Sequence, residues 1–157
     1  MRALLLLLPF LAACSLTVEL VYPGHRISDL GTQSSYCAHT NTRLDYSFFL
    51  EGRLDWLEFY WLPEGVRPED ARPEEWAALG GPVYGGAVRG FVEVTPQGAI
   101  RAVSAISAQG GVPQGISVEP SQPRRLWVRG FTGGLAGPFV QGNPVYSDTS
   151  AFCDPAW

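Results

Sequence analysis

Hydrophobic and polar residues alternate along most of this chain, which is the pattern of β-strands that bury one face. In residues 43–51, four large apolar side chains fall on one face of the predicted strand: Leu44, Tyr46, Phe48 and Leu50. Phe49 is the one apolar exception on the opposite face. The same kind of alternation occurs in residues 16–22 and 124–131, and further apolar stretches lie in residues 54–62, 88–94 and 100–106. We therefore predict a strand in each of these ranges.

Glycine and proline mark the turns between these strands. Gly52 separates residues 43–51 from residues 54–62, and this spacing predicts a β-hairpin. Thr95–Gly98 fits a tight turn with proline at its second position. The chain contains 18 glycines and 13 prolines, which favours many turns over long helices. We predict an all-β fold, an antiparallel β-sandwich (Ig-like or similar) of about seven to nine short strands, and a small closed β-barrel is the alternative.

One stretch, residues 73–79, carries helical signals instead. It begins with proline and two glutamates, and Gly80 and Gly81 follow its last residue. Proline and acids at the start and glycine just past the end are the start and stop signals of a helix. We predict a short helix of two turns here.

The strand predicted at residues 54–62 is apolar on both faces. Its apolar side chains divide into Leu57, Phe59 and Trp61 on one face and Trp56 and Tyr60 on the other. One face packs into the core, and the other either is covered or exposes an aromatic platform for sugars or partner proteins. We expect residues 63–82 to cover the second face, with Trp76 docking the predicted helix on the sheet.

The first residues differ from the rest, because an apolar run follows a single positive charge. Arg2 precedes the apolar residues 4–10, and Leu11-Ala12-Ala13-Cys14 closes the run. The run is too short for a bilayer core, which takes roughly 20 residues, and it has the parts of a secretory signal. Leu11 to Cys14 resembles the lipobox of bacterial lipoproteins at all four positions.

This resemblance implies that the thiol of Cys14 receives a diacylglyceryl group and that the chain is cut before it. Residues 1–13 are then a lipoprotein signal peptide, and residues 14–157 form a single lipid-anchored β domain of ordinary size. We expect the protein in the bacterial cell envelope, bound to a membrane through acylated Cys14 and lying on the exported face, periplasmic or extracellular. No low-complexity tether follows Cys14, so we expect the domain close to the bilayer.

Charge and composition exclude several classes of protein. The formal net charge is −4, and an acidic domain lacks the electrostatic footprint of a nucleic-acid-binding protein. All eleven basic residues are arginine. The absence of lysine excludes Schiff-base chemistry, a P-loop lysine and a Ser-x-x-Lys nucleophile pair.

After lipidation of Cys14, two cysteines and two histidines remain. An even pair of cysteines in an exported protein favours a disulfide, so we predict a bond between Cys37 and Cys153. A metal site of these cysteines with His25 and His39 is the alternative, but the spacing fits no common zinc motif. We therefore predict no metal and no cofactor.

No catalytic motif is present. Serine, histidine and aspartate occur, but a Gly-x-Ser-x-Gly elbow does not, and we place His25 and His39 in polar loops. Glu58, between Trp56 and Tyr60, could supply one half of a carboxylate pair for glycoside hydrolysis, but a place on a solvated sheet face explains it better. We predict a non-catalytic binding or structural domain, and the alternative is an envelope hydrolase acting on a glycan.

The strand at residues 124–131 supplies a candidate partner surface. If Leu126 and Val128 face the core, alternation places Arg125, Trp127 and Arg129 on the outer face. Arginine beside tryptophan permits cation–π contacts, and both residue types are enriched in binding hot spots. We interpret these residues first as a self-stacked ladder that protects a solvated sheet face. The alternative is a docking patch for an anionic partner near the membrane, an envelope protein with an acidic surface, a glycan (polysaccharide) or a lipid head group.

Overall fold

The computed structural model describes residues 23–103, 123–150 and 153 of the chain. Lipobox residues 11–14 and the strand predicted at residues 16–22 lie outside these ranges. No helix within the described ranges has the length and apolar character needed to cross a bilayer.

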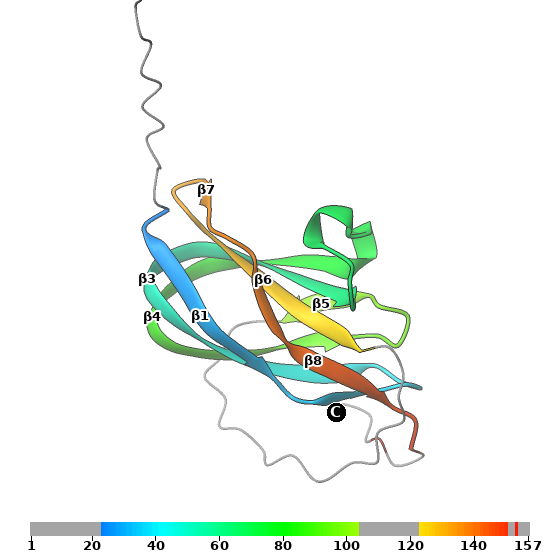
Figure 1. Ribbon diagram of the computed structural model, residues 1–157. Coiled ribbons are helices and arrows are strands. Elements are labelled where there is room, and N and C mark those ends of the chain that lie inside the picture. Colours follow the sequence, from blue (N-terminus) through cyan, green and yellow to red (C-terminus); the bar gives the residue numbers. More distant parts are fainter. Residues whose placement is uncertain (1–22, 104–122, 151–152, 154–157) are drawn as a thin grey trace, which may run out of the picture.

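The described chain is all-β, as predicted (Figure 1). Its elements are β1 (His25–Thr32), β2 (Ser35–Cys37), β3 (Thr42–Pro63), the 3-10 turns η1 (Pro68–Asp70) and η2 (Pro73–Glu75), β4 (Trp76–Val94), β5 (Ile100–Val103), β6 (Arg124–Thr132), β7 (Leu135–Ala136) and β8 (Val140–Asp148). The strand order is β2-β8-β6-β3-β4-β5, while β1 also pairs with β3 and β7 with β6. All pairs are antiparallel except β2 with β8. The sheet is open in the described chain, so the barrel alternative is not supported.

The hairpin predicted at Gly52 is wrong, because β3 continues through this glycine as one strand of 22 residues. Both halves of β3 pair with β4 instead of with each other. The register shifts between Leu50 and Arg53, which is a β-bulge, and Gly52 has a φ of 85° there. A side chain at Gly52 would also collide with the carbonyl oxygen of Gly24. The glycine therefore permits a bulge and close backbone contact, not a chain reversal.

The helix predicted at residues 73–79 is reduced to the single 3-10 turn η2, and strand β4 begins at Trp76. A two-turn helix has a high nucleation cost, whereas residues from Trp76 onward gain a backbone ladder with β3. Trp76 is 42% exposed, so it does not plug a helix onto the sheet.

Buried Glu75 fixes the turn before β4. One carboxylate oxygen accepts a hydrogen bond from the backbone N–H of Arg72 at 3.0 Å, and the other accepts one from the Arg72 guanidinium at 2.7 Å. The hydrogen bond to this guanidinium holds the pKa of Glu75 below its ordinary value. Arg124 at the start of β6 lies 3.8 Å from the same carboxylate, so the turn is tied to the neighbouring strand.

The core lies on one face of the sheet. In the first half of β3 the four even-numbered apolar residues predicted to share a face are buried. In the second half the residues of the core cluster are the odd-numbered Leu57, Phe59 and Trp61, while Tyr60 and Leu62 are buried on the opposite face. The bulges between Leu50 and Trp56 account for this change of parity. The same core includes Val92 and Val94 of β4, as the alternation predicted.

Candidate functional site

Strand β6 has the orientation that its sequence predicts. Leu126 and Val128 are fully buried in the core, so Arg125, Trp127 and Arg129 alternate onto the outer face. The side chains of these three residues are half-buried. The predicted partner surface is therefore on the outer face of the sheet, but neighbouring elements partly cover it.

The outer face continues from β6 across β3 to β4, which lie side by side (Figure 1). The registers arrange its residues in three lateral rows: Trp127, Tyr60 and Trp76; Arg129, Glu58 and Ala78; Phe131, Trp56 and Gly80. Two rows with aromatic side chains thus flank one row with an acid and a base. We call the large side chains of these rows, together with Phe139, the outer-face cluster: Trp56, Glu58, Tyr60, Trp76, Trp127, Arg129, Phe131 and Phe139.

Two groups of stacked rings form the aromatic part of this cluster. Trp56 and Phe131 stack with ring centroids 3.7 Å apart. Tyr60 stacks on Trp76 with centroids 6.3 Å apart and meets the edge of Phe139 at 5.4 Å. Tyr60 is buried whereas Trp76 is 42% exposed. Tyr60 therefore forms a floor, and Trp76 presents the solvent-accessible indole.

Arg129 lies between two aromatic rings. Its guanidinium carbon is 5.0 Å from the centroid of Phe131 and 4.7 Å from that of Phe139. Its Nε is buried without a hydrogen-bond partner among the described residues. The contacts are cation–π contacts, but they are made with phenylalanines and not with the neighbouring Trp127 that the sequence suggested. Aromatic rings thus lie against the guanidinium of Arg129, and its Nε still lacks a hydrogen-bond acceptor within the part of the chain that the structure describes.

Glu58 lies beside this arginine in the register, with its side chain half-buried. It accepts a hydrogen bond from the hydroxyl of Tyr60 at 2.7 Å. Burial raises the pKa of Tyr60, and the Glu58 carboxylate raises it further, so the phenol remains a donor at ordinary pH. Glu58 is therefore a held acceptor within the outer-face cluster, not a freely solvated side chain.

Arg125 is engaged elsewhere. Its Nε donates to the Glu64 carboxylate at 2.7 Å, and its Nη1 donates to the carbonyl oxygen of Gly142 at 3.0 Å. These contacts neutralise its charge and fix its side chain along β8. Of the three residues predicted for the partner surface, Arg125 consequently contributes least to an open site.

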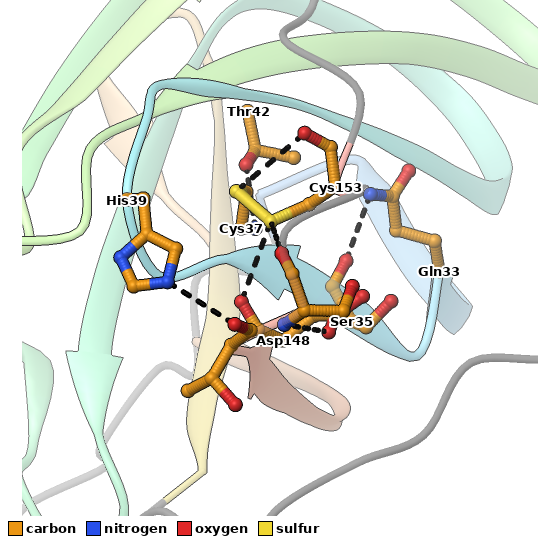
Figure 2. The surroundings of a disulfide bond; sticks show 9 residues. Gln33, Ser35, Cys37, His39, Thr42, Asp148 and Cys153 are labelled. Atoms are coloured by element: carbon orange, nitrogen blue, oxygen red, sulfur yellow. Dashed lines mark hydrogen bonds between the residues drawn. A yellow bond between two sulfur atoms is a disulfide. The ribbon is translucent and has the colours of Figure 1, made fainter.

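The predicted disulfide between Cys37 and Cys153 is present (Figure 2). Cys37 ends β2, where its backbone N–H donates to the hydroxyl of Thr42 at 2.8 Å. His39 lies nearby, within hydrogen-bond distance of the carbonyl oxygen of Thr149 at 3.2 Å. Because the two sulfurs are bonded to each other, they do not form the thiolate pair of the alternative metal site. No cluster of three or more metal-ligating side chains occurs within the described chain.

His25 is buried in β1, and its placement in a polar loop is wrong. Its Nδ1 lies 2.7 Å from the hydroxyl oxygen of Thr132, and that hydroxyl donates to the carbonyl oxygen of Arg53 at 2.6 Å. Nδ1–H is therefore the donor to Thr132, and Nε2 is buried without a partner. Desolvation lowers the pKa of His25, although the nearby backbone of Pro23 and Gly130 opposes the shift.

This burial predicts a loss of stability in mild acid. Because the folded chain binds the His25 proton less well than the unfolded chain, stability is full above the ordinary pKa of 6.5. Stability decreases as the pH falls from 6.5 toward the lower pKa that His25 has in the folded protein. We expect urea midpoints between about pH 8 and pH 5 to fall less steeply for His25→Asn than for the parent protein. His39→Asn, at an exposed histidine, is the control with the parental slope, and parallel curves for all three proteins would contradict the assignment.

Comparisons with protein-family models, curated proteins and solved structures each found no match. Function is therefore inferred from the residues of the chain and from their geometry.

Proposed function

We propose that this protein is a cell-envelope lipoprotein, anchored through Cys14 on the exported face of a membrane, whose β domain binds an envelope partner without catalysis. The four lipobox positions, Leu11 to Cys14, support this location in the cell. The disulfide between Cys37 and Cys153 supports it independently, because stable disulfides belong to oxidising compartments outside the cytoplasm.

The outer-face cluster is the observation that carries the binding role. It joins an exposed tryptophan, Trp76, to an arginine, Arg129, whose guanidinium stacks on rings instead of lying in an ion pair among the described residues. Tryptophan and arginine anchor binding sites because they offer large contact area and several donors at a small cost in mobility. Rigid strands position both side chains, which favours recognition.

Hydrolysis by a carboxylate pair has less support. Many acidic side chains form ion pairs with arginines: Asp45, Asp55, Glu64, Glu69, Glu74, Glu75 and Glu93. Glu58 accepts the Tyr60 hydroxyl. These acids are thus held by arginines or by a phenol, whereas a glycosidase needs two carboxyl groups that face each other across a cleft.

Cys14→Ala is expected to abolish lipidation and cleavage before residue 14, because alanine has no thiol to acylate. Metabolic labelling with a fatty acid and detergent phase partitioning of the mature chain measure both effects. Ser15→Ala, a change of the next residue, is the matched control and should be processed like the parent. Unchanged labelling and membrane association of Cys14→Ala would refute the lipoprotein assignment.

A further inference from the structure

We propose that the outer-face cluster is a glycan-binding site that takes uncharged sugar units, an inference that rests on the binding role proposed above and names its ligand. A sugar ring offers an apolar C–H face and a rim of hydroxyls. The cluster combines aromatic rings with a central acid and base in the same short area of sheet. The apolar face of a sugar can therefore pack on the aromatic rings, while its hydroxyls bond to the acid and the base.

The aromatic rows supply the apolar contact. Trp76 presents an indole that is 42% exposed and is stacked on the ring of Tyr60 from the neighbouring strand. Trp56, four residues before Tyr60 on β3, lies roughly 13 Å from it along the strand, and one face of its indole is stacked on Phe131. Two supported indoles at this separation match an extended oligosaccharide of a few units better than a single small molecule.

The row between them supplies the hydrogen bonds. Glu58 has acceptor capacity beyond the bond from Tyr60, and Arg129 has donor capacity because its Nε has no hydrogen-bond partner among the described residues. Acceptor and donor are neighbours across β3 and β6. Vicinal hydroxyls of a sugar are both donors and acceptors, so this pair can bind them together.

Small residues on β4 leave one side of the rows open. Ala78 lies beside Glu58, and Gly80 lies beside Trp56, where larger side chains would cover the acid and the indole. Ala78 and Gly80 are both exposed. A ligand can therefore approach Glu58 and Trp56 from the β4 side, next to Trp76.

The charge of the site selects an uncharged ligand. Arg125 is paired with Glu64 at 2.7 Å, and Glu58 places an acidic side chain next to Arg129 in the register. The whole chain carries a formal net charge of −4, which repels a polyanion at long range. The arginines alone favoured an anionic partner. The acidic side chains beside them and the negative net charge of the chain disfavour it.

The experiment is calorimetric titration of the full-length lipidated protein in detergent micelles. The probes are cellohexaose and chitohexaose, two uncharged extended glycans, and polygalacturonate as the anionic one. We expect one or both hexasaccharides to bind with little dependence on salt. Trp76→Ala should weaken this binding by about tenfold or more, as for a buried tryptophan hot spot, and Glu58→Gln should weaken it less because its amide oxygen still accepts from Tyr60.

Tyr84→Ala is the matched control. Tyr84 is also an aromatic residue of β4 and is 67% exposed, but it lies outside the outer-face cluster. We expect this variant to bind the hexasaccharides as tightly as the parent. Equal losses of hexasaccharide affinity in Trp76→Ala and Tyr84→Ala would refute the location of the site. Tighter binding of polygalacturonate, with a steep salt dependence, would refute the proposal that the ligand is uncharged.

A second arm separates this inference from the proposed function. The same micellar protein is incubated with detergent-washed envelopes, together with the triple variant Arg125→Ala, Trp127→Ala, Arg129→Ala. One outcome is that the envelopes retain the parent but not the variant, and that none of the three glycans displaces the parent. This outcome would refute a glycan as the ligand and leave the binding role intact. Equal retention of folded parent and variant, or no retention of either, would overturn the binding role at this face as well.

Discussion

Replacing both Cys37 and Cys153 by alanine is expected to lower the free energy of unfolding by as much as roughly 4–5 kcal/mol in the chain-entropy model. The two residues are 116 positions apart in the chain, so their bond closes a very long loop of the unfolded state. In the folded state it holds β2, a strand of three residues. Loss of the bond also loosens Tyr36 of β2, whose ring meets the Trp61 ring edge-on at 5.3 Å.

Urea denaturation of the parent and the double variant, each with and without reductant, measures this effect. Reductant should destabilise the parent to the level of the variant and leave the variant unchanged, because the variant has no disulfide to lose. Mass spectrometry without reductant should show a crosslinked peptide of Cys37 and Cys153 in the mature parent. Free thiols at both positions, or equal urea midpoints for parent and variant, would contradict the expected stabilisation.

The alternation of apolar residues was sufficient to predict the faces of the strands. Side chains predicted to point inward, such as Leu44 and Leu126, are fully buried, because a strand has a strict period of two and one face must pack. The partner of each strand was not predictable in the same way. Gly52 has the same sequence signature in a hairpin turn and in a bulge. Only non-local contacts distinguish them: both halves of β3 pair with β4, and Gly24 lies against Gly52.

The segment at residues 73–79 shows the limit of local signals. Its proline and acids do start a turn, but the helix stops after three residues. Trp76 pairs with Tyr60 of β3, 16 positions earlier in the chain, and this backbone pairing outweighs a weak helical preference. A short sequence window contains no information about this pairing.

The sequence predicted the residues of the candidate site on each strand, but not how the strands bring them together. Alternation placed Trp127 and Arg129 on the outer face of β6, and Trp56 and Tyr60 on the second face of β3. Sequence could not show that these two faces are continuous, because that depends on the register between Glu58 and Arg129. It also missed Phe139, which precedes β8 and packs against Tyr60 and Arg129; its only signal was a lone aromatic residue after proline.

Phe59→Ala is expected to cost about 3–5 kcal/mol of unfolding free energy, the range for truncating a buried phenylalanine. Phe59 is 0% exposed and lies in the second half of β3. Its ring is 5.0 Å from that of Tyr46, which comes from the first half of the same strand, beyond the bulge at Gly52. The two halves of β3 therefore meet in one core, and removal of the ring leaves a cavity where they join.

Phe49→Ala is the matched control, since Phe49 is the same residue type on the same strand but is 45% exposed. We expect this variant to lose less than about 1 kcal/mol, as is usual for surface substitutions. Urea unfolding followed by tryptophan fluorescence measures both variants, and Phe59→Leu provides a milder change if the alanine variant does not fold. Equal destabilisation by Phe59→Ala and Phe49→Ala would mean that β3 does not present opposite faces to core and solvent. In that case the outer-face cluster, which depends on the same alternation through Glu58 and Tyr60, would lose its structural basis as well.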